Sequence, residues 1–260
     1  MKDEDILALL ATEEERAEAR RLLALIGEAE ATGAPQWSEF LDPAAQTRAG
    51  LLLQRSPGLA YDLAGGYAAA ERRRLVLRPR SLRAEEAPPH IAAVRLEGDF
   101  PEAPSRQDLL GAVLRLGIKA GKVGDVVPDA AGGTVFLVEE LAPTVEERLL
   151  EVAGIPVTAR EVAPEEVAAP AERKKEVRAT VAGLRLDAVA AAGFGTSRTQ
   201  MSREIKGLRV RLNWRPAADP DAEVKVGDVI ALRGRGRLVV AEITGTTKKG
   251  RLGVRLERYF

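Results

Sequence analysis

The feature that most constrains the fold is a change of hydrophobic period between Ile91 and Val162. Short apolar runs bounded by turns, which indicate strands, lie at 91–96, 125–128, 134–138 and 157–162. Apolar residues at three- and four-residue spacing, which indicate helices, lie at 105–116 and 145–152. The order strand, helix, strand, strand, helix, strand predicts a split βαβ unit with one antiparallel sheet.

Ferredoxin-like domains and RNA-recognition motifs (RRMs) share this order, so we predict a ferredoxin-like, RRM-like βαββαβ domain over residues 71–163. RRMs stack bases on aromatic side chains of the two central strands. In the predicted third strand, the only aromatic residue is Phe136. Two possibilities stay open: the sheet binds RNA, or it packs against the N-terminal part of the chain.

Residues 1–70 are predicted to form a helical N-terminal region. Helical periodicity runs from residue 2 to residue 31. Asp42 followed by Pro43 is typical of an N-cap and the first residue of a second helix, which extends to about Gln54. The chain as a whole is therefore expected to be α+β.

Basic and acidic residues are unevenly distributed, although the formal net charge is zero. From Lys174 to the end there are 19 Lys and Arg and 9 Asp and Glu, and the rest of the chain has 20 and 30. Residues 164–180, rich in charge and containing two prolines, are predicted to be a linker before a domain at 181–260. The asymmetry favours a polyanionic partner for that domain, although an excess of solvated arginines would also explain it.

Two short helices are predicted at the start of this domain. The first runs from 184 to about 192, and the second begins at Ser197, which has capping-box spacing, and ends at Gly207 as its C′ residue. Three polar side chains spaced four apart share one face of the second helix: Arg198, Ser202 and Lys206.

Apolar and polar residues alternate after the second helix, which predicts a strand over 209–215 with a polar face that includes Asn213. Two basic turns follow, at 234–237 and 248–250. Lys and Arg neutralise phosphates, and Arg also presents a planar fork of donors. The predicted RNA-binding residues are Arg185, Arg198, Ser202, Arg203, Lys206, Arg209, Arg211, Asn213, Arg215, Arg235, Arg237, Lys248 and Lys249, with Arg72, Arg73 and Arg74 as a secondary contact.

Four segments of the domain resemble the RNA-binding domain named after ribosomal protein S4. They are Leu184-Arg185-Leu186-Asp187, Ser197-Arg198, residues 205–213 and Val226-Gly227-Asp228-Val229-Ile230. Most relatives have Gly where this chain has Trp214. The resemblance implies that Arg185 and Arg198 contact RNA.

From Trp37 onward the chain looks like the YlmH family of bacterial S4-domain proteins. The segments that carry this resemblance are Phe40-Leu41-Asp42-Pro43, Gly65-Gly66-Tyr67, Ala70-Glu71-Arg72, Leu109-Leu110-Gly111-Ala112, Leu116-Gly117-Ile118, Lys122-Val123-Gly124-Asp125 and Thr246-Thr247-Lys248-Lys249. The family often has a histidine near the start of the central helix, whereas Ser105-Arg106-Gln107-Asp108 has none.

The resemblance implies a non-catalytic factor in ribosome-associated quality control. It would bind the large ribosomal subunit, contacting 23S ribosomal RNA and peptidyl-tRNA, beside or instead of an RqcH-type factor. A ribosome-assembly or regulatory RNA-binding factor is an alternative, and an RNA-modifying enzyme is a weaker one. Neither Gly65-Gly66 nor Gly132-Gly133 lies in the strand-loop-helix arrangement that a methyltransferase needs.

Other classes of function find little support in the sequence. The absence of cysteine excludes disulfides and thiolate chemistry, and the single histidine, His90, lies in a proline-rich stretch. We expect no cofactor and no metal site. With no signal peptide and no apolar run long enough for a membrane span, we also expect a cytoplasmic monomer that does not bind membranes.

Overall fold

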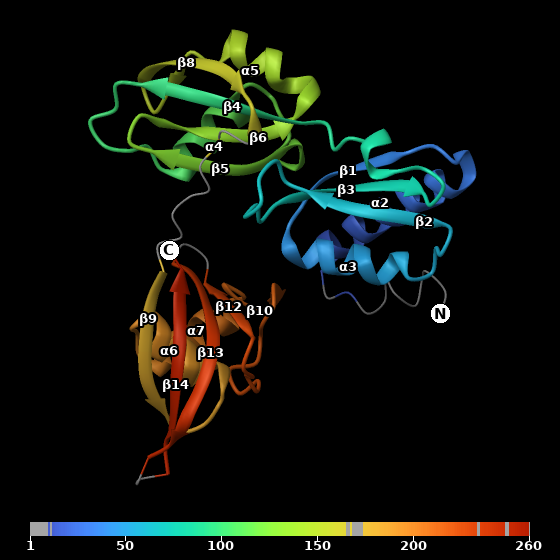
Figure 1. Ribbon diagram of the computed structural model, residues 1–260. Helices are drawn as coiled ribbons and strands as arrows, with labels where there is room; N and C mark the ends of the chain where they lie inside the picture. Colours follow the sequence, from blue (N-terminus) through green and yellow to red (C-terminus); the bar gives the residue numbers. More distant parts are fainter. Residues whose placement is uncertain are drawn as a thin grey trace. The chain divides into compact units, whose positions relative to one another are not determined.

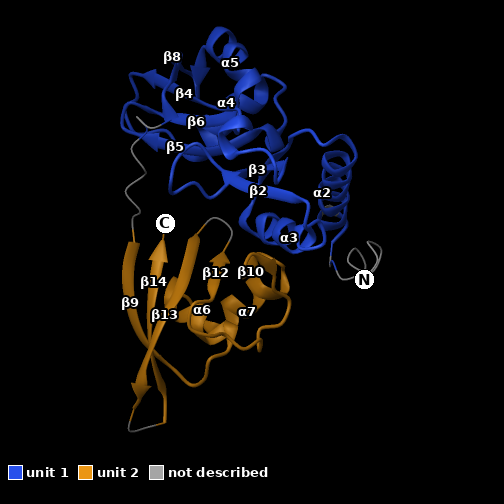
Figure 2. Ribbon diagram, turned by 45° about the vertical axis from the view of Figure 1, so that its right-hand side comes forward, with its two compact units in different colours: residues 1–170 blue, residues 171–260 orange. Residues whose placement is uncertain are grey.

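The computed structural model describes residues 10, 12–164, 167, 174–232, 235–247 and 250–259 (Figure 1). It forms two compact units, Met1–Pro170 and Ala171–Phe260, which Figure 2 shows in different colours. No helix in the described ranges is long and apolar enough to cross a lipid bilayer.

Among its described residues, the N-terminal part of the first unit contains the helices α2 (Glu13–Thr32) and α3 (Pro43–Leu53). Asp42 caps α3 as predicted, its carboxylate accepting a hydrogen bond from the Ala45 backbone N–H at 2.8 Å. The helices pack on a three-stranded sheet with the order β1-β3-β2. Its strands are β1 (Gln36–Leu41), β2 (Leu59–Ala64) and β3 (Arg73–Pro79).

This sheet corrects two expectations for the N-terminal region. The region is not purely helical, because β1 and β2 flank α3 in the sequence. It also extends beyond residue 70, because β3 pairs with β1 and β2 rather than with the strands that follow it. Short strands give only a weak periodic signal, and a helix lies between β1 and β2 in the sequence. The helical periodicity therefore dominated the sequence pattern.

The rest of the first unit has the predicted split βαβ topology. Four strands and two helices follow the expected order: β4 (Ile91–Gly98), α4 (Arg106–Arg115), β5 (Val123–Asp129), β6 (Gly132–Val138), α5 (Ala142–Arg148) and β8 (Ile155–Val162). The sheet order is β5-β6-β4-β8-β7, with the two-residue strand β7 (Glu151–Val152) added at one edge. Three short 3₁₀ turns connect these elements, at Ala84–Glu86, Ala120–Lys122 and Glu139–Leu141.

Phe136 lies on the sheet face opposite α4 and α5, where an RRM would stack bases, but its side chain is fully buried. The Tyr67 ring stacks on it with centroids 4.8 Å apart. Gly66 has a φ of +92°, and a Cβ there would lie 2.4 Å from a Phe136 ring carbon, so only glycine allows this approach. The sheet therefore packs against the N-terminal part of the chain through Phe136, which is the second of the two possibilities left open by the sequence.

As far as its residues are described, the second unit is a six-stranded antiparallel sheet with two helices. Its elements are β9 (Lys174–Val181), α6 (Leu186–Phe194), α7 (Arg198–Lys206), β10 (Val210–Leu212), β11 (Arg215–Pro216), β12 (Val229–Leu232), β13 (Gly236–Thr246) and β14 (Leu252–Tyr259). Because β9 pairs with β14 along its whole length, residues 174–180 are a strand of this sheet and not part of a linker.

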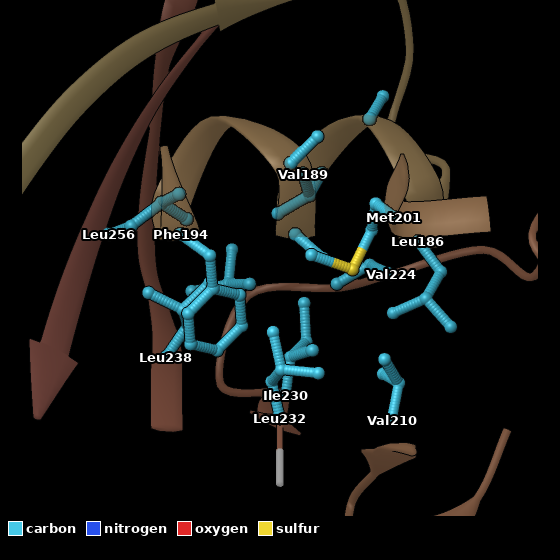
Figure 3. Close-up of a cluster of buried hydrophobic side chains, with 14 of the residues drawn as sticks. Leu186, Val189, Phe194, Met201, Val210, Val224, Ile230, Leu232, Leu238 and Leu256 are labelled. Atoms are coloured by element: carbon cyan, nitrogen blue, oxygen red, sulfur yellow. The ribbon is translucent and has the colours of Figure 1, made fainter. Parts of the chain in front are cut away.

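The core of the second unit lies between the two helices and one face of the sheet, and Figure 3 shows its side chains. Met201 and Ile205, four residues apart on α7, are fully buried. At Gly193 a Cβ would lie 2.3 Å from a Leu238 side-chain carbon, so α6 approaches the sheet more closely than any larger residue would allow. This packing fixes α6 and α7, and with them the polar side chains at their ends.

Candidate nucleic-acid interface

Asp187 holds the two arginines that the S4 resemblance singles out. Its carboxylate lies in the first turn of α6 and is buried, with 5% of the side chain exposed. Arg198 donates to it from Nη2 at 2.7 Å, and Arg185 donates from Nε and Nη2 at 3.3 Å each. The side chains of Arg185 and Arg198 are themselves 46% and 51% exposed. A buried anion therefore positions two half-exposed cations.

Electrostatics at this cluster favour the charged forms of Asp187 and Arg185. Burial acts to raise the pKa of Asp187, but hydrogen bonds from Arg185 and Arg198 outweigh it and lower that pKa below its ordinary value. The bond from Arg185 to Asp187 likewise raises the pKa of the Arg185 guanidinium. A guanidinium has five N–H donors, and the carboxylates use only some of them. The others suit a phosphate, to which Arg binds bidentately.

Asp187 gives a pH-dependent contribution to stability. Its pKa is lower in the folded protein than its unfolded value of about 3.9, so the stabilisation is complete above that value and is lost as the pH falls through the folded pKa. The difference in unfolding free energy between wild type and Asp187→Asn should be constant near neutral pH and shrink below about pH 4. Urea unfolding across this range measures it, and a difference that does not change with pH would refute the assignment.

A second carboxylate, Asp221, also contacts Arg185. Backbone hydrogen bonds hold its loop against the start of α6: Leu186 N–H donates to the Ala222 carbonyl at 2.9 Å, and Asp187 N–H to the Pro220 carbonyl at 3.0 Å. Unlike Asp187, the Asp221 side chain is 62% exposed. It therefore neutralises part of the charge of Arg185 without fixing the arginine in place.

The other predicted cations do not join this cluster as one group. Arg209 and Arg235 line a pocket beside α7 together with Gln200 and Glu204. Gln200 is two residues after Arg198, so the two side chains point to different sides of the helix. Arg209 is paired with Glu204 at 3.1 Å. The helix therefore has Arg198, Ser202 and Lys206 along one side and an arginine-lined pocket along another.

Arg211 and Arg237 lie on the opposite face of the sheet from the helices. Each pairs with Ala231 across the strands, so both share its face, whereas their neighbours Leu212 and Leu238 point to the core. The Arg237 guanidinium lies 4.7 Å from the centre of the Tyr259 ring. The predicted cations of this domain therefore do not all lie on one face of the sheet.

Two turns around β10 differ from the sequence prediction. Leu208, not Gly207, takes the left-handed conformation that ends α7, with φ +56°. Leu208 N–H donates to Ile205 and Arg209 N–H to Glu204, which is the Schellman pattern shifted by one residue. The predicted strand also ends early, because Asn213 and Trp214 form a turn between β10 and β11. There Asn213 Nδ2 donates to Asp228 at 2.8 Å.

Ser202 lies partly exposed on α7, and Arg203, Lys206 and Arg215 are exposed. Lys248 and Lys249 lie outside the described residues. The sequence alone did not identify Asp187 as the partner of Arg185 and Arg198, or Asp221 as a second partner of Arg185. Asp187 stands next to a predicted helix start, where an acidic residue is expected to favour the helix dipole, so nothing marked it as a partner of Arg198.

Each arginine of the triplet at residues 72–74 donates hydrogen bonds to backbone carbonyls. Arg74 is buried and donates to the backbone carbonyls of Ser38, Pro89 and His90. Arg72 donates to the carbonyls of Val123 and Phe40 at 3.0 Å each. Burial lowers the pKa of both guanidinium groups. Because Arg73 also donates to the Ala70 carbonyl, we do not include the triplet in the interface.

Comparisons with known proteins agree with this geometry. A family model described as the S4 domain matches residues 184–230, which contain Arg185, Asp187 and Arg198. The solved structure of "Cell division protein ylmH from Streptococcus pneumoniae" aligns with a TM-score of 0.51 at 20% identity. It covers 61% of this chain and 97% of that one, which is a likeness of fold.

The chain is also similar to a curated protein of Bacillus subtilis (strain 168), "Ribosome-associated protein quality control protein P2". The two are 33% identical over 224 residues, which make up 85% of this chain and 86% of the relative. The similarity therefore spans both units. On this evidence the chain belongs to the YlmH family of S4-domain proteins.

Proposed function

We propose that the protein is a non-catalytic RNA-binding factor that binds the large ribosomal subunit in quality control of stalled nascent chains. The observation that carries this proposal is the Arg185–Asp187–Arg198 cluster inside the S4 match. It presents two half-exposed guanidinium groups that a buried carboxylate positions. The name of the Bacillus subtilis relative supports the ribosomal setting.

The mechanism is adhesive rather than chemical. Arg185 and Arg198 bind phosphates of 23S ribosomal RNA, and further cations around α7 extend the contact. Peptidyl-tRNA is the second proposed partner, because a stalled large subunit still carries it. The first unit, which holds the acidic excess, contacts protein, for which an RqcH-type factor is the proposed partner. We propose that the protein itself acts in the cytoplasm.

Capture of the tagged full-length protein from its own cells tests this function. We expect 23S ribosomal RNA and peptidyl-tRNA to be enriched over an untagged strain. Enrichment of immature subunits without peptidyl-tRNA would favour an assembly factor instead. Mass spectrometry of ribosomal RNA from a deletion strain tests the remaining alternative, because a lost modification would favour an RNA-modifying enzyme.

Asp221→Asn should strengthen RNA binding. The exposed carboxylate competes with phosphate for Arg185, and exposed ion pairs of this kind are weak. The affinity for large subunits should therefore rise by about 1.5- to 5-fold at low salt. Filter binding measures the change, with Asp219→Asn in the same loop as a control for the general loss of negative charge. Equal or weaker binding by Asp221→Asn would argue against phosphate binding at Arg185.

A further inference from the structure

The turn between β10 and β11 has an unusual residue at its tip. Leu212 pairs with Arg215, which leaves Asn213 and Trp214 as the two central residues of a hairpin turn. Their φ angles are +49° and +67°, so both are left-handed, as in a type I′ turn. Asparagine followed by glycine is the pair that this turn favours, because glycine has no Cβ to clash. An aromatic side chain at the second position is strained.

The rest of the turn is firmly held. The Asn213 backbone N–H donates to the Val229 carbonyl at 2.7 Å, and its side-chain carbonyl accepts from Val229 N–H at 2.9 Å. Its amide N–H₂ donates to Asp228 at 2.8 Å. These hydrogen bonds of Asn213 fix the turn. They therefore hold the backbone of Trp214 in its strained conformation.

Packing does not account for the tryptophan. Its side chain is partly exposed and does not belong to the hydrophobic core cluster, although Leu212 and Ala217 on either side pack against that cluster. Among the described side chains, no aromatic partner stacks on the indole and no cation lies over it. Glycine would relieve the strain at no cost to the core.

The neighbours of Trp214 suit a nucleic acid. Arg215 follows it and is exposed, on the face that it shares with its cross-strand partner Leu212; Arg211, before the turn, lies on the other face. An aromatic ring beside a cation suits single-stranded RNA, because a base stacks on the ring while the cation binds the backbone. Such stacking needs a base that is not already stacked inside a duplex.

We propose that Trp214 stacks on an unpaired nucleotide base of the bound RNA. This inference rests on the proposed function and deepens it, since it specifies a single-stranded or flipped-out base as part of the bound RNA. The ring supplies affinity that is tolerant of sequence, because every base has a flat π-face.

Tryptophan fluorescence tests the proposal directly. The chain has two tryptophans, so the full-length Trp37→Phe variant leaves Trp214 as the sole reporter. Titration with a short mixed-sequence single-stranded RNA should quench this fluorescence to saturation, whereas the same strand annealed to its complement should quench it far less. Saturating binding of the single strand without quenching would overturn the proposal.

Substitutions at position 214 separate stacking from folding. Trp214→Gly should keep or raise the thermal midpoint, because it removes strain, yet lower single-strand affinity by about 5- to 100-fold. Trp214→Phe should retain most of the affinity, and Trp214→Leu should not. Wild-type affinity in both Trp214→Gly and Trp214→Leu would overturn the inference alone if the wild-type protein still binds large subunits. If the wild type binds neither RNA nor subunits, the proposed function fails with it.

Discussion

Replacing Arg185 and Arg198 together with Ala should release the protein from large ribosomal subunits. Both guanidinium groups are positioned by Asp187 and half exposed, and hydrogen bonds from charged donors to phosphate are stronger than neutral ones. The combined loss corresponds to an affinity at least about 100-fold lower. Co-sedimentation with purified subunits measures it. Each single variant should show an intermediate loss if, as proposed, each side chain binds a phosphate of its own.

A control in the first unit matches this variant closely. Arg16 and Arg20 on α2 share the carboxylate of Glu13 at 3.1 and 2.8 Å, much as Arg185 and Arg198 share Asp187. Arg16→Ala with Arg20→Ala removes the same charge from a similar motif and should leave subunit binding unchanged. Equal losses in the two double variants would show that net charge alone governs binding.

Asp125→Ala should destabilise the first unit by about 3–5 kcal/mol. The carboxylate is 2% exposed and accepts three hydrogen bonds, from Tyr67 Oη at 2.8 Å and from the backbone N–H groups of Glu71 and Arg72 at 2.7 and 3.1 Å. Removing it leaves three donors without an acceptor, each costing about 1–3 kcal/mol where water cannot enter. It also frees the loop that carries Tyr67 onto Phe136.

Urea unfolding followed by Trp37 fluorescence measures this loss in a Trp214→Phe background, so that the signal comes from the first unit alone. Asp62→Ala is the control, because Asp62 is 51% exposed and paired with Arg78 at the surface, and it should cost less than about 1 kcal/mol. A similar small effect for Asp125→Ala would mean that the loop does not depend on the carboxylate.

Local patterns were sufficient to predict much of the fold. Periodicity identified the split βαβ unit, and Asp42-Pro43 identified the start of α3, because these signals depend only on neighbouring residues. The pairing of β3 with β1 and β2, and of β9 with β14, depends on contacts between distant segments and left no such signal. Domain boundaries were misplaced for that reason.

The candidate site was predictable in its residues but not in their partners. Arg185 and Arg198 followed from the motifs, yet the carboxylate that joins them is visible only once α6 and α7 are packed together. The same limit applies to Arg72 and Arg74, whose charges suggested a surface patch although their donors serve backbone carbonyls. Sequence shows where cations are, but burial decides which of them remain available.

The dependence of large-subunit binding on salt tests the central claim most directly. Each phosphate neutralised by Lys or Arg adds about 0.7–0.9 to the slope of log affinity against log salt concentration. We predict a steep negative slope for the wild-type protein, and a slope shallower by about 1.5 for the variant that lacks Arg185 and Arg198. A wild-type affinity that does not change with salt, or the same slope in both proteins, would contradict phosphate binding by this arginine pair.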